Sequence, residues 1–366
     1  MRTIGILFII AAISVFSCKD NQTSEKKEIK QSTASQPKSR LDLMKLVKPV
    51  FNSQIIVGED VKIELTQIED SLQPDSVHLY YNSKLIETAI GSQLQFTMNT
   101  KNSKVGKNSL RIAIYYPGEN LEFENRNITL LSDINPELLT CNIVERYHHD
   151  RNAFTQGLLI HDGIMYEGTG QYGKSSLRKL DLKTGELISS LNLPEKYFGE
   201  GIAVFDDKII QLTYLSRLGF VYDLEGFNKL HTVQYPTQGW GLTSDGEQLL
   251  MSDGSERIYF LDPEFFAEKK RIEIYDHEGP VKMLNELEYI DGKVYANVYQ
   301  SDYFIIFDPT SGKVLKKIDC SHLVPEEYQN DRERVLNGIA WDESSGKLYL
   351  TGKNWPYLYE IELVQP

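Results

Sequence analysis

The pattern that decides the fold begins at Phe154-Thr155-Gln156-Gly157-Leu158 and returns at Phe198-Gly199-Glu200-Gly201-Ile202. Three later segments open in the same way: Gly239-Trp240-Gly241-Leu242, Asn285-Glu286-Leu287-Glu288 and Leu336-Asn337-Gly338-Ile339-Ala340. The starts are 40 to 51 residues apart, and each is followed by short apolar runs separated by turn sequences such as Asp291-Gly292. Units of this length with four short strands are typical of β-propeller blades. The five starts therefore predict an all-β, five-bladed β-propeller over residues 138–366.

The last unit is one strand short, since the chain reaches its end after the strand-like segment Glu360–Leu363. A spare apolar segment, Cys141–Tyr147, lies just before the first unit. We expect this segment to complete the last blade, because a ring closed in that way leaves no open strand edge. The alternative, an open β-solenoid, would need shorter repeats.

Residues 46–133 alternate between apolar and polar side chains in short runs such as Val61-Lys62-Ile63-Glu64-Leu65. Alternation with a period of two, broken by turn sequences, is typical of half-buried antiparallel strands. The length and pattern predict a small immunoglobulin-like β-sandwich. This segment contains no candidate catalytic cluster, so a spacer or interaction module is the expected role.

The N-terminus has the features of an export signal. Arg2 is followed by an apolar run of about a dozen residues, which is too short to span a bilayer. Val15-Phe16-Ser17-Cys18 resembles a bacterial lipobox, so residues 1–18 are expected to be a lipoprotein signal peptide with Cys18 as the lipidated residue. A plain secretory signal with an incidental cysteine is the alternative. Polar residues 19–45 predict a flexible tether, and the protein is expected to be anchored to the cell envelope, on the periplasmic or the surface face.

Charge and cysteine content narrow the possible partners. A formal net charge of -13 argues against nucleic acid, because phosphate binding needs a basic surface. Three cysteines cannot form a disulfide-rich scaffold. Cys141 and Cys320 both lie in apolar, strand-like contexts, and buried free thiols are favoured over a disulfide between them.

A propeller brings the first residues of its innermost strands around one mouth of the axial channel. These positions hold Gln156, Glu200, Trp240, Asn285 and Asn337. Small and aliphatic residues would fill a narrow channel at lower cost, so this polar set indicates a binding or catalytic site. The alternative is that the polar groups bond neighbouring loops or hold channel waters or an ion.

Glu200 is the leading candidate for catalysis. We expect Gly199 and Gly201 to let the backbone turn tightly and a ligand approach closely, and Tyr197-Phe198 to desolvate the carboxyl and raise its pKa toward the range that suits proton transfer. No activated serine or cysteine accompanies it, and the seven histidines are scattered, which argues against a zinc site. A glycosidase would need a second carboxylate, for which Glu286 and Glu288 are candidates.

The order of these motifs, completed by Thr351-Gly352-Lys353-Asn354-Trp355-Pro356, resembles the glutaminyl-peptide cyclotransferases of the plant and bacterial type, typified by the papaya latex enzyme. The resemblance covers about residues 140–364 and leaves out the sandwich and the tether. It implies a five-bladed propeller, and an aminoacyltransferase that converts the N-terminal glutamine of peptides to pyroglutamate with release of ammonia. The zinc-dependent animal enzymes of the same activity are unrelated.

The resemblance also implies the roles of individual residues. Glu200 would be the general base and acid, and Asn285 would bind the amide oxygen. Substrate orientation and the apolar walls would come from Phe154, Gln156, Tyr214, Trp240, Tyr299 and Lys353, although the plant enzyme has tryptophan where this chain has Tyr214 and Tyr299.

No cofactor is expected, and a structural divalent cation in the channel is possible but not predicted. The expected partners are peptides or proteins with N-terminal glutamine and, through the anchor, a membrane; the protein is expected to be a monomer. The alternative function is a non-catalytic surface propeller that binds peptide or glycan.

Overall fold

The computed structural model describes residues 42–68, 72–91, 93–118 and 120–366. The predicted signal peptide, Cys18 and residues 19–41 of the predicted tether lie outside the described residues. Among the residues described, no helix is long and apolar enough to cross a membrane. The described secondary structure consists of β-strands and two 3-10 helices, η1 (Ser321–Leu323) and η2 (Glu326–Tyr328), which agrees with the predicted all-β class.

The N-terminal part contains two sheets. A three-stranded sheet has the order β1-β3-β6, and a five-stranded sheet has the order β2-β8-β7-β4-β5. Alternate residues of β3, Val61, Ile63 and Leu65, are buried in one apolar cluster with Leu79 and Ile112 of the other sheet, as the alternation predicts. The immunoglobulin-like topology stays a prediction. The strands are β1 (Met44–Lys48), β2 (Gln54–Ile56), β3 (Asp60–Gln67), β4 (Ser76–Tyr81), β5 (Lys84–Ile90), β6 (Gln95–Asn99), β7 (Gly106–Tyr116) and β8 (Asn120–Leu131).

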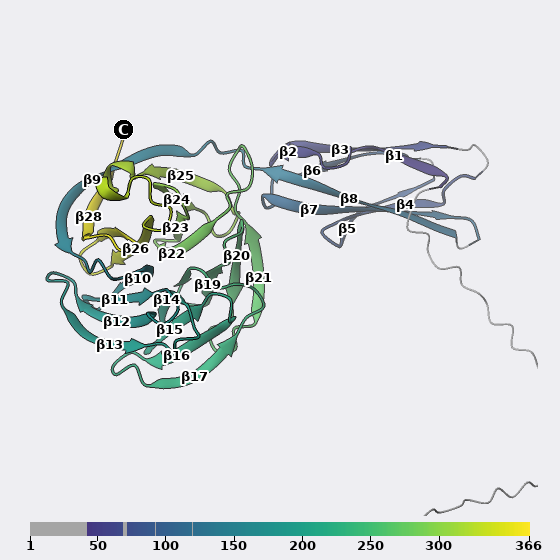
Figure 1. Cartoon of the computed structure of the whole chain (residues 1–366). Coiled ribbons are helices and arrows are strands. Elements are labelled where there is room, and N and C mark those ends of the chain that lie inside the picture. Colours follow the sequence, from purple (N-terminus) through teal and green to yellow (C-terminus); the bar gives the residue numbers. More distant parts are fainter. Residues whose placement is uncertain (1–41, 69–71, 92, 119) are drawn as a thin grey trace, which may run out of the picture. The chain divides into compact units, whose positions relative to one another are not determined.

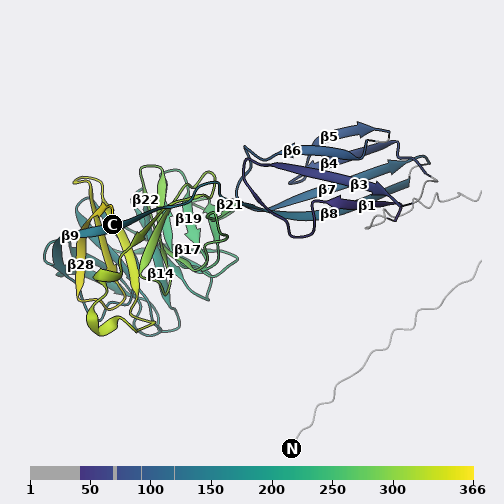
Figure 2. The same cartoon turned by 90° about the horizontal axis from the view of Figure 1, so that it is seen from above.

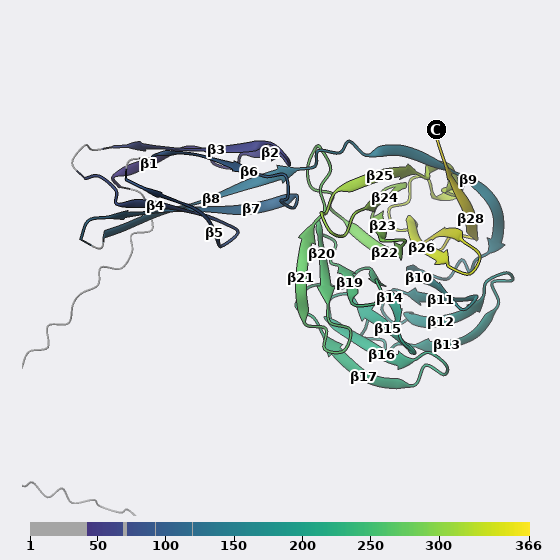
Figure 3. The same ribbon diagram turned by 180° about the vertical axis from the view of Figure 1, so that it is seen from behind.

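The repeats form successive antiparallel sheets arranged around an axis, as a propeller requires (Figures 1 and 3). The first three sheets have four strands each and follow chain order. Their strands are β10 (Thr155–His161), β11 (Ile164–Thr169), β12 (Ser176–Asp181) and β13 (Leu187–Asn192); β14 (Gly199–Phe205), β15 (Lys208–Thr213), β16 (Leu218–Asp223) and β17 (Lys229–Gln234); β18 (Leu242–Ser244), β19 (Leu249–Ser252), β20 (Arg257–Leu261) and β21 (Glu268–Glu273).

The remaining strands join in one eight-stranded sheet of order β22-β23-β24-β25-β9-β28-β27-β26. Its central strand, β9, pairs in antiparallel fashion with β28 and in parallel with β25. The expectation that Cys141–Tyr147 supplies the missing strand is therefore confirmed. The strands are β9 (Glu137–His148), β22 (Leu284–Ile290), β23 (Lys293–Val298), β24 (Tyr303–Phe307), β25 (Val314–Asp319), β26 (Leu336–Asp342), β27 (Lys347–Gly352) and β28 (Tyr357–Val364).

The inner strands close into a ring. β10 contacts β14, β14 contacts β18, β18 contacts β22, β22 contacts β26, and β26 returns to β10. Each junction between successive units also has its own apolar cluster, such as Ile210 and Leu212 packed with Leu249 and Met251. We interpret this ring as the five-bladed arrangement that the repeats predict. Figure 2 shows the same sheets from above.

Candidate active site

Four of the inner strands are distorted at the position of the polar residue. The strand register shifts between Thr155 and Gly157 in β10, and the same occurs around Glu200 in β14, Asn285 in β22 and Asn337 in β26. A bulge adds a residue without a direct partner and changes where its side chain points. The repeat thus places a bulged polar residue at the same end of each of these strands.

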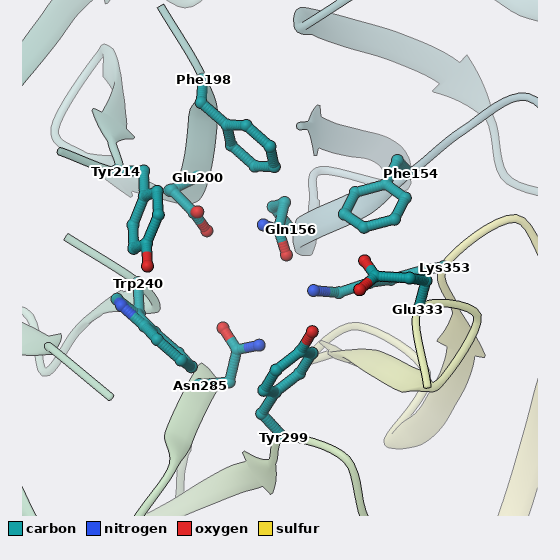
Figure 4. A pocket seen from close by; sticks show the side chains of 10 residues that line it. All are labelled: Phe154, Gln156, Phe198, Glu200, Tyr214, Trp240, Asn285, Tyr299, Glu333 and Lys353. Atoms are coloured by element: carbon teal, nitrogen blue, oxygen red, sulfur yellow. The ribbon is translucent and has the colours of Figure 1, made fainter. Parts of the chain in front are cut away.

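Three of these polar residues, Gln156, Glu200 and Asn285, meet in one pocket of about 130 Å³ (Figure 4). All eight residues predicted for catalysis and substrate binding line it, although they come from segments as far apart as residues 154 and 353. The lining residues are Phe154, Gln156, Phe198, Glu200, Tyr214, Trp240, Asn285, Tyr299, Glu333 and Lys353.

Glu200 and Lys353 are the buried charged groups of the pocket, with 4% and 3% of their surfaces exposed. Burial raises the pKa of Glu200 well above its ordinary value, although the Lys353 ammonium and a hydrogen bond from Gln156 oppose the rise. Burial also lowers the pKa of Lys353 to about 8, against the opposing effect of Glu200 and Glu333. Burial therefore opposes the charged form of both groups, which makes the Glu200 carboxyl a stronger base and the Lys353 ammonium a stronger acid than the free groups.

Aromatic rings form the walls. The ring of Trp240 makes edge contacts with Tyr214 and Tyr299, with ring centres 6.2 and 5.6 Å apart. The Nζ atom of Lys353 lies 4.8 Å from the centre of the Phe154 ring and 4.7 Å from that of Tyr299. These two rings face the ammonium with their electron-rich surfaces, which favours its charged form.

Asn285 brings an amide group to the pocket. Its backbone carbonyl accepts a 2.6 Å hydrogen bond from Ser252 Oγ, which fixes the strand at that point. Its side chain is 1% exposed, and the Oδ1 atom has no hydrogen-bond partner among the described residues. A buried polar atom without a partner is costly, so this amide is prepared for a ligand that can hydrogen-bond with it.

Asn337 and the two other glutamates of the inner strands do not line the pocket. Asn337 Nδ2 donates to Thr155 O at 2.9 Å and to Gln156 Oε1 at 3.3 Å, which orients the Gln156 amide. Glu286 accepts from the backbone N–H groups of Leu158 and Ile339, and Glu288 from that of Trp341. The glycosidase hypothesis therefore loses its second carboxylate, because these side chains hold neighbouring strands together.

A buried network of charged groups supports the wall that carries Phe154 and Gln156. His149 Nδ1 lies 2.7 Å from the carbonyl oxygen of Trp355, and Nε2 lies 3.0 Å from Glu167 Oε1. The Trp355 carbonyl can only accept, and Glu167, whose pKa is lowered despite its burial by contacts with His149 and Arg178, accepts when it is ionised. These partners outweigh burial, raise the pKa of His149 and favour the imidazolium. Thr155 Oγ1 donates to the same Glu167 oxygen at 2.7 Å, and Arg178 binds the other at 3.1 Å. In the sequence, His148-His149 is only a tandem pair of histidines, and no pattern indicates that His149 contacts Glu167.

Phe198 and Glu333 are the two lining residues that sequence reasoning did not select. Phe198 precedes the Gly199-Glu200 motif directly and was read only as a source of desolvation. Glu333 lies in residues 320–335, the connection between β25 and β26, which is longer than the other connections between successive repeat units. The sequence signal that could have indicated Glu333 is an acidic residue in the longest connection between repeat units.

The interpretation of the glycines beside Glu200 was wrong. Neither Gly199 nor Gly201 has a positive φ. A Cβ atom on Gly199 would lie 2.6 Å from Thr169 O, and one on Gly201 would lie 2.5 Å from Trp240 O. These glycines therefore let neighbouring inner strands pack closely, rather than letting a ligand approach the backbone.

Within residues 42–68, 72–91, 93–118 and 120–366, no three His, Cys, Asp or Glu side chains are grouped as metal ligands.

A family model for glutamine cyclotransferases matches residues 121–363. The chain belongs to the glutamine cyclotransferase family. The match includes every residue of the pocket and β9, and it excludes most of the N-terminal two-sheet part.

Two relatives agree with this assignment. The glutaminyl-peptide cyclotransferase of Arabidopsis thaliana is 38% identical over 237 residues, which cover 64% of this chain and 74% of the plant protein. The crystal structure of Myxococcus xanthus glutaminyl cyclase is 34% identical and superposes with a TM-score of 0.58, covering 63% of this chain and 98% of the other.

Proposed function

We propose that this member of the family converts the N-terminal glutamine of peptides to pyroglutamate and releases ammonia. The observation that carries the proposal is the meeting of Glu200, Gln156, Asn285 and Lys353 in one aromatic-walled pocket. The names of the relatives support the same reaction.

The reaction needs proton transfer rather than a protein nucleophile. The α-amino nitrogen of the substrate attacks the Cδ atom of its own side-chain amide and forms a five-membered ring. Glu200 accepts the proton that the amine loses and passes it to the amide nitrogen, which leaves as ammonia when the C–N bond breaks. A buried carboxyl with a raised pKa is suited to both steps.

The other pocket residues position the substrate. The Asn285 amide can donate to the amide oxygen as negative charge develops there, and its unpartnered Oδ1 can accept from the leaving amide nitrogen. Gln156 and Lys353 orient the amide and the peptide carbonyl, and Phe154, Tyr214, Trp240 and Tyr299 enclose the aliphatic part. Holding the amine against the amide in a dry pocket supplies much of the rate acceleration.

The test is turnover of a short peptide that begins with glutamine, followed by ammonia release and by loss of the free amino group. The matched control is the same peptide with an acetylated N-terminus, which leaves the amide intact but removes the nucleophile. We expect ammonia from the first peptide only. Binding of both peptides without any ammonia would indicate the non-catalytic module and refute the proposal.

We also propose that the enzyme is exported, lipidated at Cys18 and active as a monomer at the cell envelope. The lipobox-like sequence before Cys18 and the polar segment after it support this proposal. Cell fractionation tests it: the full chain should be found with membranes, and a Cys18→Ser variant should not be. Equal membrane association of the two would contradict it.

A further inference from the structure

Cys141 and Cys320 lie next to each other at the junction where the ring closes. β9 pairs in parallel with β25, and the register places Thr140 opposite Asp319. The next residue of each chain segment is a cysteine, and the two Sγ atoms are 3.9 Å apart. Both side chains are buried, with 3% and 0% of their surfaces exposed.

The surroundings favour chemistry at this pair. The sulfurs lie in the apolar cluster between the last two units of the propeller, with Leu139, Ile318 and Leu323. His322 Nε2 lies 3.8 Å from Cys141 Sγ. The hydrogen bond between the thiols lowers the pKa of Cys141 and raises that of Cys320, so Cys141 is the sulfur that ionises first.

Both thiols are free in the structure, as the sequence favours; from their proximity we propose that Cys141 and Cys320 nevertheless form a disulfide when the protein folds in an oxidising compartment. Neighbouring strands are about 4.8 Å apart, which is within the range of Cα separations that a disulfide spans. The two sulfurs already face each other, so rotation of the side chains can bring them to bonding distance. This site is separate from the pocket, and the inference does not rest on the proposed enzymatic function.

The oxidant is a small-molecule or protein disulfide. The Cys141 thiolate attacks one sulfur of that disulfide, which releases one thiolate and leaves a mixed disulfide on Cys141. Cys320 then loses its proton and attacks the Cys141 sulfur, which releases the second thiolate. Two electrons pass from the cysteines to the oxidant, and the two protons go to the released thiolates. Because both side chains are buried in the folded protein, the exchange takes place before β9 has packed.

The cross-link would secure the two features that depend on this junction. It fastens β9, the strand that completes the eight-stranded sheet, to the unit before it. It also fixes the first residue of the 320–335 connection, whose Glu333 reaches the pocket. Joining positions so far apart in sequence restricts the unfolded chain strongly.

The direct test is a cysteine map of the full chain refolded with reduced and oxidised glutathione. Remaining thiols are blocked with iodoacetamide under denaturing conditions, and the protein is digested without reduction. We expect the peptides of Cys141 and Cys320 to appear as one cross-linked species, and Cys18 to be alkylated. Alkylation of both Cys141 and Cys320 in protein that has regained its native circular dichroism would overturn the proposal, and so would a cross-link from either to Cys18.

Thermal unfolding gives a second measurement. Dithiothreitol should lower the melting temperature of the refolded full chain by about 5–10 °C. It should leave a Cys141→Ala/Cys320→Ala variant unchanged, while a Cys18→Ser control should respond like the unaltered chain. An equal response of the double variant and the unaltered chain would contradict the disulfide. If the double variant does not fold, the cysteine map alone decides.

Discussion

At the scale of single residues, the pocket pairs a carboxyl and an amine whose pKa values are moved toward each other by burial. Desolvation opposes the charged form of each group, while their mutual attraction favours it. Lys353 can orient the substrate through its charge only while its ammonium group is protonated.

We expect the kcat/KM of the proposed reaction to fall above about pH 8, because the Lys353 ammonium is lost as the pH rises through its pKa. Lys353→Arg keeps its charge at that pH, so its activity should stay level where the parent enzyme declines. The measurement is the pH profile of ammonia release, and its shape is the readout even if the arginine lowers the rate. The same decline in both enzymes would assign it to another group.

His149 allows a prediction of stability. Burial alone would lower its pKa, but Glu167 and the Trp355 carbonyl outweigh burial, so the pKa is raised. Its contribution to stability is present in full below the unfolded value of about 6.5 and is lost as the pH rises through the folded value. His149→Gln should cost about 3–5 kcal/mol at pH 6, since it removes one of the two cations that balance the buried Glu167 carboxylate and leaves only Arg178. Urea unfolding at several pH values measures the free energy of unfolding of both proteins. The parent protein should become less stable as the pH rises through the folded pKa of His149, and the variant should not show this decrease. The same pH dependence in both proteins would contradict the role of His149.

At the scale of elements, the inner strands β10 and β14 combine a bulge with a glycine, Gly157 or Gly201, that lets the neighbouring inner segment pack closely. The Gln156, Glu200 and Asn285 side chains reach the pocket because their strands bulge there. The repeat therefore specifies both the ring and the site. A polar residue in this position was predictable from the sequence, but its hydrogen-bond partner was not.

Gly201→Ala tests the close packing of two inner strands. Its Cβ would meet Trp240 O and Leu242 N at 2.5 and 2.6 Å, so β14 must separate from the segment Trp240–Leu242 that leads into β18. We expect a loss of about 1–3 kcal/mol in stability and a clear loss of ammonia release. The control is Gly163→Ala, where φ is positive but no atom lies within 4 Å of the new Cβ. That variant should lose some stability and keep its activity; equal activity of the two variants would refute the packing role.

At the scale of the whole molecule, the chain closes its ring with a strand that precedes all the repeats. The sequence predicted this because one unit lacked a strand. Equivalent positions of the repeats predicted that Gln156, Glu200, Trp240 and Asn285 meet at one mouth, whereas the other four predicted pocket residues came from the resemblance to the glutaminyl-peptide cyclotransferases: Phe154, Tyr214, Tyr299 and Lys353. It did not reveal Glu333, which depends on the path of a long loop, or the network of His149, Glu167 and Arg178, which only the packing of strands brings together. It also misread Gly199 and Gly201, since a glycine alone does not say whether it accommodates a turn, a ligand or another strand.

The role of β9 predicts a difference between two truncated chains. A chain that begins at residue 134 keeps β9 and should stay folded and active. One that begins at residue 150 exposes the edges of β25 and β28, which should cause aggregation. Size-exclusion chromatography and circular dichroism compare them. Equal behaviour of the two chains would mean that β9 does not hold the ring closed.

The most direct test of the central claim is the rate of ammonia release by the parent enzyme and by Glu200→Gln, measured side by side on a glutamine-led peptide. The amide has nearly the shape of the carboxyl but cannot carry the proton, so we predict that kcat falls about 10²–10⁴-fold while the melting temperature and peptide binding are kept. A folded Glu200→Gln enzyme with undiminished kcat would contradict the account.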